Sequence, residues 1–260
     1  MTDYNTVEYK QDEAVAIISI ARPDSMNSFN EELRQDLLRA LQRAARDDSV
    51  RAVVLTGQGR SFCAGADLKE GLGKTKSIEE VLQTEYRPIL QCIASMRQPV
   101  IAAINGSAVG IGLSVALNCD LLIIADNAFL LSPFTTISLV PDGGLNWLLV
   151  HQLGYRRAFE LSIQSERINA DRCVELGLAN RSVAADDLVD EAVAWGKKLA
   201  ERAPLSVETT KQAMRHAASA DWASTFDFEA SNQDRLIASE DAREGIDAFI
   251  EKRKPEFTGK

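Results

Sequence analysis

The sequence contains few of the residues that build metal centres or disulfide frameworks. Its 260 residues include four cysteines and two histidines, and none of them has the CxxC or cysteine–histidine spacing typical of a zinc site. A chain of 28.5 kDa buries about 73% of its unfolded surface on folding, so its core can be stable without disulfides or a structural metal ion. We therefore expect no metal site, and reduced thiols in a cytoplasmic protein.

Positive charge and long hydrophobic runs are also scarce. The chain has 29 Lys and Arg against 38 Asp and Glu, a net charge of −9. Binding to nucleic acid or to an anionic membrane surface requires an excess of basic residues, so neither is an expected partner. The N-terminal segment MTDYNTVEYK is polar and lacks the apolar core of a signal peptide. The longest apolar region, residues 100–125, is too interrupted to span a membrane, being broken by Asn105, Gly106, Gly110, Gly112, Asn118 and Asp120.

Short apolar runs alternate with helical patterns over the first half of the chain. We predict strands at 6–10, 14–20, 51–57, 100–104 and 120–125, separated by helices at 31–46, 78–96 and 113–119. This alternation is typical of the α/β class, in which crossover connections join parallel strands. From residue 145 onward the pattern is almost entirely helical. The longer helices of this part are predicted near 186–202, 204–219, 221–238 and 241–252.

No linker or repeat interrupts the chain. We predict one continuous fold, with a core over residues 1–199 and a helical extension over residues 200–260. The extension is rich in alanine and charge and too polar to form a core alone. We expect it to pack on the core or on a neighbouring subunit.

Two strand-to-helix turns are candidates for a ligand site. SFCAGADLK (61–69), within a predicted loop over 58–76, follows the strand 51–57, and NGSAVGIGLS (105–114) follows the strand 100–104. Ligands of α/β proteins collect at the carboxyl ends of strands, and glycine lets the backbone approach them. Two such turns could aim two backbone N–H groups at one oxygen, which is the geometry of an oxyanion hole. Ordinary turns are the alternative, and neither segment has the glycine spacing of a dinucleotide or phosphate loop.

The segment LVPDGGLNW (139–147) offers a single acidic side chain. Asp142 lies in a Pro-Asp-Gly turn at the start of a predicted helix. It is either a turn residue or N-cap, or a lone carboxylate that moves protons near the two turns. His151, about two helical turns later, is interpreted as a surface or packing residue.

The motifs RPDSMNSFN, SFCAGADLKE, QPVIAAINGSAVGIGLSVALNCDLLIIA, SLVPDGG and REGIDAFIEKRKPEF occur in this order along nearly the whole chain. Together they resemble the crotonase superfamily, the enoyl-CoA hydratase/isomerase family. The resemblance implies a spiral of ββα turns with a C-terminal helical trimerisation region, and a homotrimer or a dimer of trimers. It also implies an acyl-CoA thioester as substrate, with coenzyme A as part of the substrate and no separate cofactor.

The resemblance assigns roles to individual residues. Ala66 and Ile111 match the two oxyanion-hole positions, which act through their backbone N–H groups. Residues that match positions beside the nucleotide part of coenzyme A are Ala64, Leu68, Lys69, Phe249 and Lys252. Phe249 and Lys252 would reach over from a neighbouring subunit. An ordinary solvated lysine is the alternative for Lys69 and Lys252.

The sequence departs from the family pattern where a hydratase carries its two glutamates. Those positions hold Ser114 and Phe134 here, and neither side chain can replace a carboxylate that handles the protons of water. Asp142 matches an aspartate used by dienoyl-CoA isomerases and by ring-modifying isomerases of phenylacetyl-CoA degradation. The resemblance therefore favours an enoyl-CoA isomerase in which Asp142 carries one proton. We expect Phe134 and Trp147 to line an apolar pocket that raises the pKa of Asp142.

Three other functions remain open at this stage. One is a hydratase that uses Asp142 with an unusual partner, and another is a dehalogenase-like enzyme in which Asp142 attacks carbon. The third is a non-catalytic acyl-CoA-binding or assembly protein. The sequence does not specify the acyl group.

Overall fold

Two β-sheets organise the computed structural model, which describes residues 4–70 and 76–260. The six-stranded sheet has the order β1-β2-β3-β5-β7-β10, with β1 antiparallel to β2 and every other pair parallel. Its strands are β1 (Val7–Asp12), β2 (Val15–Ile20), β3 (Ala52–Gly57), β5 (Val100–Ile104), β7 (Leu121–Ala125) and β10 (Arg181–Val183). Residues 71–75 of the predicted loop 58–76 lie outside the described residues.

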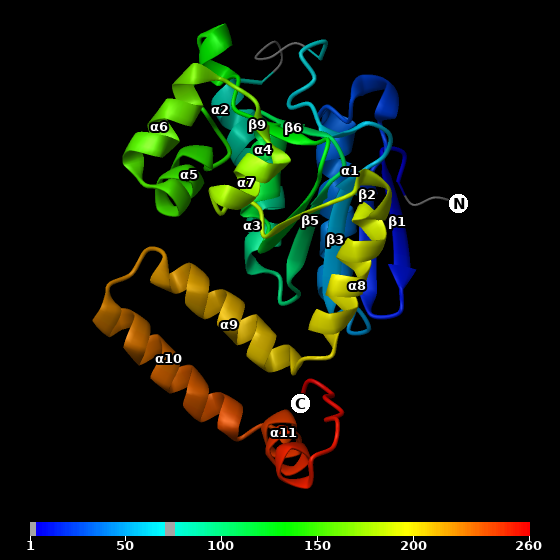
Figure 1. The fold of residues 1–260 in the computed structure, drawn as a ribbon, viewed down its shortest axis with the longest axis vertical. Helices are drawn as coiled ribbons and strands as arrows, with labels where there is room; N and C mark the ends of the chain where they lie inside the picture. The colour runs from blue at the N-terminus through cyan, green and yellow to red at the C-terminus, as the bar shows by residue number, and fades with distance from the viewer. Residues whose placement is uncertain (1–3, 71–75) are drawn as a thin grey trace.

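A second, four-stranded sheet carries the short strands that follow the long ones. It has the order β4-β6-β8-β9 and is formed by β4 (Ser61–Cys63), β6 (Ser107–Val109), β8 (Phe129–Leu131) and β9 (Ile168–Asn169). Three times the chain passes from the large sheet to the small sheet and then into helices. This is the spiral of ββα turns that the resemblance implies, and it confirms the predicted α/β class (Figure 1).

Helices surround the sheets and continue to the end of the chain. Those of the spiral are α1 (Glu31–Arg46), α2 (Ile78–Val81), α3 (Arg87–Ser95), α4 (Ile111–Asn118), α5 (Leu145–Leu153), α6 (Tyr155–Gln164) and α7 (Ala170–Glu175). They are followed by α8 (Leu188–Ala200), α9 (Pro204–Ala217), α10 (Trp222–Ile237) and α11 (Glu240–Glu251). The helical character predicted for the last part of the chain is confirmed. Among residues 4–70 and 76–260, no helix is both long and apolar enough to cross a membrane.

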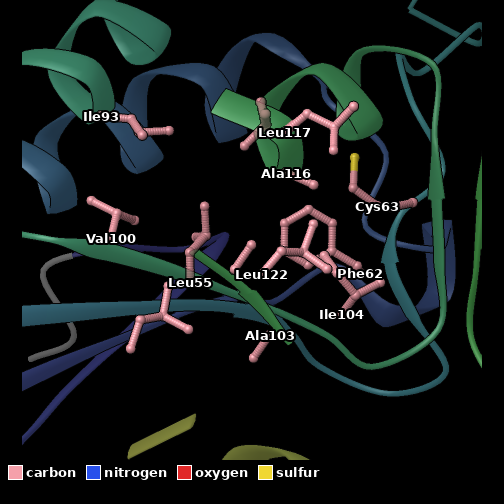
Figure 2. Packing of buried hydrophobic residues seen from close by; sticks show 14 of the residues in the cluster. Leu55, Phe62, Cys63, Ile93, Val100, Ala103, Ile104, Ala116, Leu117 and Leu122 are labelled. Atoms are coloured by element: carbon pink, nitrogen blue, oxygen red, sulfur yellow. The ribbon is translucent and has the colours of Figure 1, made fainter. Parts of the chain in front are cut away.

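The core lies between the large sheet and the helices on its two faces. Strands β3 and β5 are apolar almost throughout and buried, as expected of parallel strands covered on both sides. Helix α8 packs on one face of these strands. On the other face Leu55 and Ile104 join Phe62, Ile93 of α3 and Leu117 of α4 in one apolar cluster (Figure 2).

Two features of this part of the fold differ from the prediction. The second sheet was not expected, because strands of two or three residues are too short to show an alternating pattern. The helix predicted over 78–96 is divided into α2, a π-helical turn over Leu82–Tyr86, and α3. Pro88 has no N–H to donate to the carbonyl of Thr84, so the regular helical bonding is interrupted there.

A buried lysine attaches the C-terminal helices to the core. Lys211 of α9 is 9% exposed, and its Nζ lies 2.7 Å from Asp120 Oδ2. The same ammonium group donates to the carbonyls of Ile93 and Gln98 at 2.8 and 3.0 Å. Arg215 pairs with the other Asp120 oxygen at 2.9 Å. Beyond α9, helices α10 and α11 extend away from the sheets (Figure 1). The division of the chain near residue 200 stays a prediction.

We predict that Lys211→Met lowers the free energy of unfolding by about 3 kcal/mol, because it leaves the carbonyls of Ile93 and Gln98 without this donor and Asp120 with Arg215 as its one remaining cation among the described residues. Urea denaturation at a fixed protein concentration measures the change. Lys197→Met is the control, since Lys197 pairs with Asp12 and Glu13 at the surface and its loss should change stability by less than about 1 kcal/mol. Equal effects of the two substitutions would contradict the anchoring role of Lys211.

Candidate active site

A cavity of about 310 Å³ brings the three candidate motifs together. Its wall is formed by Ala64–Ala66 after β4, by Gly110 and Ile111 at the start of α4, and by Asp142 before α5. Apolar side chains complete much of the lining, namely Leu68, Ile78, Val81, Leu82, Val109, Pro133, Phe134, Ile137 and Leu139. The cavity is thus largely apolar, with a few polar groups at defined places, as is typical of small-molecule sites.

The two glycine-containing turns lie against each other because β4 and β6 are parallel neighbours. A Cβ atom on Gly110 would lie 3.8 Å from the Gly65 Cα, and one on Gly65 would lie 3.2 Å from the Val109 carbonyl oxygen. Both glycines also have a positive φ, +101° for Gly65 and +57° for Gly110. A side chain would therefore be strained at either position, and one at Gly65 would also press on the Val109 carbonyl.

Each turn supplies one free backbone amide to the cavity. Among the described residues, neither the Ala66 N–H nor the Ile111 N–H donates a hydrogen bond to another group. Ile111 is the first residue of α4, where helical amides have no partner within the helix and the helix dipole is positive. Two neighbouring amides of this kind can bind an oxygen that acquires negative charge.

The turn that carries Asp142 is hydrogen-bonded to α4. The Asp142 carbonyl oxygen accepts hydrogen bonds from the Ser114 Oγ at 2.9 Å and from the Leu145 N–H at 3.1 Å. Gly143 has a φ of +62°, and a Cβ atom there would lie 2.4 Å from the Ile111 Cδ1. Ser114 is one helical turn after Ile111, so α4 positions both the amide and the acidic residue.

Asp142 is half-buried in the cavity wall. Its Oδ1 atom is enclosed and has no hydrogen-bond partner in the described part of the chain. Burial raises the pKa of Asp142 to about 6, because the ionised form has lost water and gained no cation. A carboxyl group with this pKa can accept and return a proton near neutral pH.

The two aromatic residues predicted to surround Asp142 lie in different places. Phe134 is buried and lines the cavity. The prediction for Trp147 is wrong, because its side chain is 45% exposed and takes no part in the lining. Trp147 lies on the solvent side of α5, where its ring lies tilted against His151 with 4.1 Å between centroids. Of the two aromatic residues, Phe134 alone therefore shares the cavity with Asp142.

The predicted coenzyme A residues are only partly gathered in one chain. Ala64 and Leu68 line the cavity, whereas Lys69 is exposed and lies outside its lining. Phe249 is 85% exposed, and Lys252 follows it at the end of α11. Helix α11 lies at the opposite end of the molecule from α2, which borders the cavity (Figure 1). A single chain therefore does not bring Phe249 and Lys252 to this site.

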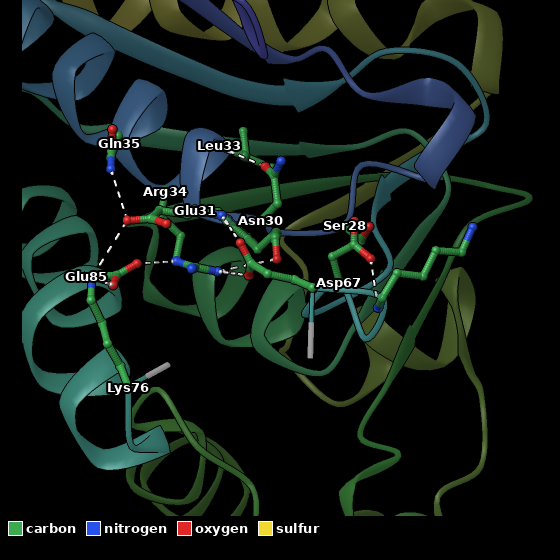
Figure 3. Close-up of polar contacts among 12 residues, drawn as sticks. Ser28, Asn30, Glu31, Leu33, Arg34, Gln35, Asp67, Lys76 and Glu85 are labelled. Atoms are coloured by element: carbon green, nitrogen blue, oxygen red, sulfur yellow. Dashed lines mark hydrogen bonds and ion pairs between the residues drawn. The ribbon is translucent and has the colours of Figure 1, made fainter. Parts of the chain in front are cut away.

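Sequence reasoning did not find a charged cluster that also lines the cavity. Arg34 of α1 is buried and pairs with Glu85 at 2.6 Å and with Glu70 at 3.0 Å, while Lys76 pairs with Glu85 at 2.8 Å (Figure 3). The available signal was Arg34 itself, a charge on the buried face of an amphipathic helix, three residues before Leu37. Glu85 reaches the cluster from the π-helical turn, which no sequence pattern marked.

Known proteins resemble this chain over its whole length. The sequence profile of the family described as Enoyl-CoA hydratase/isomerase matches residues 10–260. A probable enoyl-CoA hydratase of Rhodobacter capsulatus is 39% identical over 257 residues, 99% of each chain. A 1,2-epoxyphenylacetyl-CoA isomerase of Escherichia coli K12 is 34% identical, over 96% of this chain and 97% of its own. The solved structure of an enoyl-CoA hydratase subunit from Geobacillus kaustophilus is 34% identical, with a TM-score of 0.93 over 99% of this chain and 100% of its own.

We predict that Asp142→Asn stabilises the protein in a pH-dependent way. The folded-state pKa of Asp142, about 6, is above the unfolded value of about 3.9, so ionisation opposes folding increasingly between pH 4 and 6 and fully above that. The variant should be about 1–2 kcal/mol more stable than wild type at pH 8, and less so at pH 4. Urea denaturation at both pH values tests this, with the exposed Asp126→Asn as control. The same stability difference at both pH values would contradict a raised pKa.

Proposed function

Because the chain belongs to the enoyl-CoA hydratase/isomerase family, we propose that it is an enoyl-CoA isomerase that moves a double bond in a chain or ring by proton transfer through Asp142. One observation carries this proposal. Four carboxylates line the cavity in the described part of the chain, Glu31, Glu70, Glu85 and Asp142. The three glutamates pair with Arg34 or Lys76, and Asp142 alone has no cationic partner.

The proposed reaction needs one base and one site for negative charge. Asp142 removes a proton from the carbon next to the thioester of a 3-enoyl-CoA, and the electron pair moves into a dienolate. The Ala66 and Ile111 amides hold the enolate oxygen while the charge is there. The protonated Asp142 then returns the proton two carbons further along, which gives the conjugated 2-enoyl-CoA. Coenzyme A stays attached throughout, so we propose that no separate cofactor takes part.

The environment of Asp142 suits this role. A base with a pKa of about 6 holds a proton about a hundredfold more strongly than a free aspartate and is still ionised at pH 7–8. Burial keeps water from the Asp142 Oδ1 atom, and this loss of hydration raises the pKa. The same enclosure limits competing protonation of the dienolate by solvent.

Hydration is the alternative reaction. The Rhodobacter relative is a probable hydratase and supports this alternative, whereas the Escherichia coli relative is an isomerase. Against hydration, Ser114 is fully buried and donates its hydroxyl to the Asp142 carbonyl, and Phe134 is apolar. Neither side chain can take a proton from water during its addition to the double bond. A purely binding protein is disfavoured because an unpaired buried carboxylate gives such a protein no evident advantage.

We predict that Asp142→Asn lowers kcat for 3-enoyl-CoA isomerisation by about 10²–10⁴-fold while acyl-CoA binding is retained, because only the base is lost. The absorbance of the conjugated thioester measures turnover, and calorimetry measures binding. In the wild type, kcat/KM should rise with pH and level off above about 6, as Asp142 becomes ionised. Asp126→Asn is the control for both assays. Rapid conversion of 2-enoyl-CoA to a 3-hydroxyacyl product by the wild type would favour the hydratase instead.

We also propose that the enzyme is a cytoplasmic homotrimer or a dimer of trimers. The C-terminal helices expose large apolar side chains, namely Trp222, Phe226, Phe249 and Ile250. Grouped apolar exposure of this kind is typical of protein–protein interfaces. Association through this region would carry Phe249 and Lys252 to the site of a neighbouring chain, beside its Lys69 and the nucleotide of coenzyme A.

We predict a solution mass of three or six times 28.5 kDa by light scattering. The double substitution Trp222→Asp and Phe226→Asp should lower this mass, because it places two charges on the exposed apolar face of α10. Glu229→Gln on the same helix is the control and should leave the mass unchanged. A wild-type protein that is monomeric at all concentrations would contradict the proposed assembly.

A further inference from the structure

Tyr86 places a second unpartnered polar atom in the wall of the cavity. The residue is 5% exposed, and its hydroxyl is enclosed without a hydrogen-bond partner in the described part of the chain. Five side chains there have such an atom, and only Tyr86 and Asp142 line the cavity. Buried polar groups without partners are rare in folded proteins and need an explanation.

The tyrosine ring is fixed in place, so its hydroxyl cannot turn to find a partner elsewhere. Its edge packs on Phe29, with 5.5 Å between centroids and an angle of 73° between the rings. The Arg34 guanidinium lies 5.3 Å from the ring centroid, and Arg34 is itself held by Glu85 and Glu70 (Figure 3). Tyr86 also ends the π-helical turn, which sets the direction of its side chain.

The hydroxyl remains a hydrogen-bond donor at neutral pH. Burial raises the pKa of Tyr86, and the Arg34 guanidinium, which can only donate to the phenol oxygen and cannot accept its proton, opposes this in part. The phenol therefore keeps its proton. Tyr86 lines the same cavity as Asp142.

We propose that the Tyr86 hydroxyl donates a hydrogen bond to an oxygen atom carried by the acyl group, so that the enzyme prefers oxygen-bearing acyl-CoAs to purely hydrocarbon ones. The inference rests on the proposed function in taking this cavity as the acyl-CoA site. The thioester oxygen is already assigned to the Ala66 and Ile111 amides, so the partner of Tyr86 must be another oxygen. A hydrocarbon chain offers the enclosed hydroxyl no acceptor and leaves it unpaired, whereas a hydroxyl, carbonyl or ring ether would pair with it.

Binding of saturated acyl-CoAs tests the proposal without relying on turnover. Calorimetry would compare hexanoyl-CoA with its 4-, 5- and 6-hydroxy derivatives. We expect the wild type to bind at least one hydroxy derivative about tenfold more tightly than hexanoyl-CoA. Tyr86→Phe should remove this preference and leave hexanoyl-CoA binding unchanged. Tyr9→Phe is the matched control, because Tyr9 also has a buried unpartnered hydroxyl but lies on β1, outside the cavity lining.

The other possible results contradict either the role of Tyr86 or the proposed function. Equal binding of all four compounds by the wild type overturns the role of Tyr86 and leaves the proposed function standing, and this comparison needs no variant. A preference that survives Tyr86→Phe, or a loss of hexanoyl-CoA affinity in that variant, also overturns it. Failure of the wild type to bind any acyl-CoA overturns the proposed function as well. Absence of isomerase activity together with the expected binding pattern contradicts the proposed isomerisation but not the proposed role of Tyr86 in binding the acyl group.

Discussion

The close approach of the Gly65 and Gly110 turns is the constraint on which the site depends. The parallel pairing of β4 with β6 sets the two turns side by side, and the missing side chains let the backbones touch. Helix α4 starts directly after Gly110, so its first amide, that of Ile111, lies beside the Ala66 turn. One turn later on the same helix, Ser114 holds the carbonyl of Asp142. The base and the two amides therefore share one rigid support.

Some polar side chains that line the cavity have hydrogen-bond or ion-pair partners, and others have none. We assign a structural role to the first group and a role towards the ligand to the second. Arg34 and Lys76 neutralise Glu70 and Glu85, and their ion pairs stiffen the wall. Asp142 and Tyr86 instead keep buried atoms without partners, which opposes folding. Buried polar groups without partners are rare, and a ligand in the cavity would supply partners for these two. The fold supplies the stability elsewhere, through the continuous apolar packing of β3 and β5 and the anchoring of α9 by Lys211.

The helices, strands and turns that depend on a local sequence pattern could be predicted from the sequence. The amphipathic run of α1, the buried runs of β3 and β5, and the acidic turn before α5 could all be predicted. The second sheet could not, because its strands are too short for a pattern. Trp147 was misplaced because the six apolar residues among the nine of α5 do not form a single stripe, so the sequence does not reveal which side faces the core. The position of Tyr86 could not be predicted because it depends on the π-helical turn near Pro88. The site that Phe249 and Lys252 would approach could not be predicted either, because it would belong to another chain.

The central claim is that Asp142 removes hydrogen from the carbon beside a thioester whose oxygen the two amides hold. Proton exchange at that carbon measures this step directly, because it needs neither a double bond nor a product. We expect the wild type to exchange the α-protons of bound hexanoyl-CoA for deuterium in D₂O, followed by nuclear magnetic resonance, and Asp142→Asn to bind the same compound without exchange. Exchange at the wild-type rate in Asp142→Asn would contradict the claim.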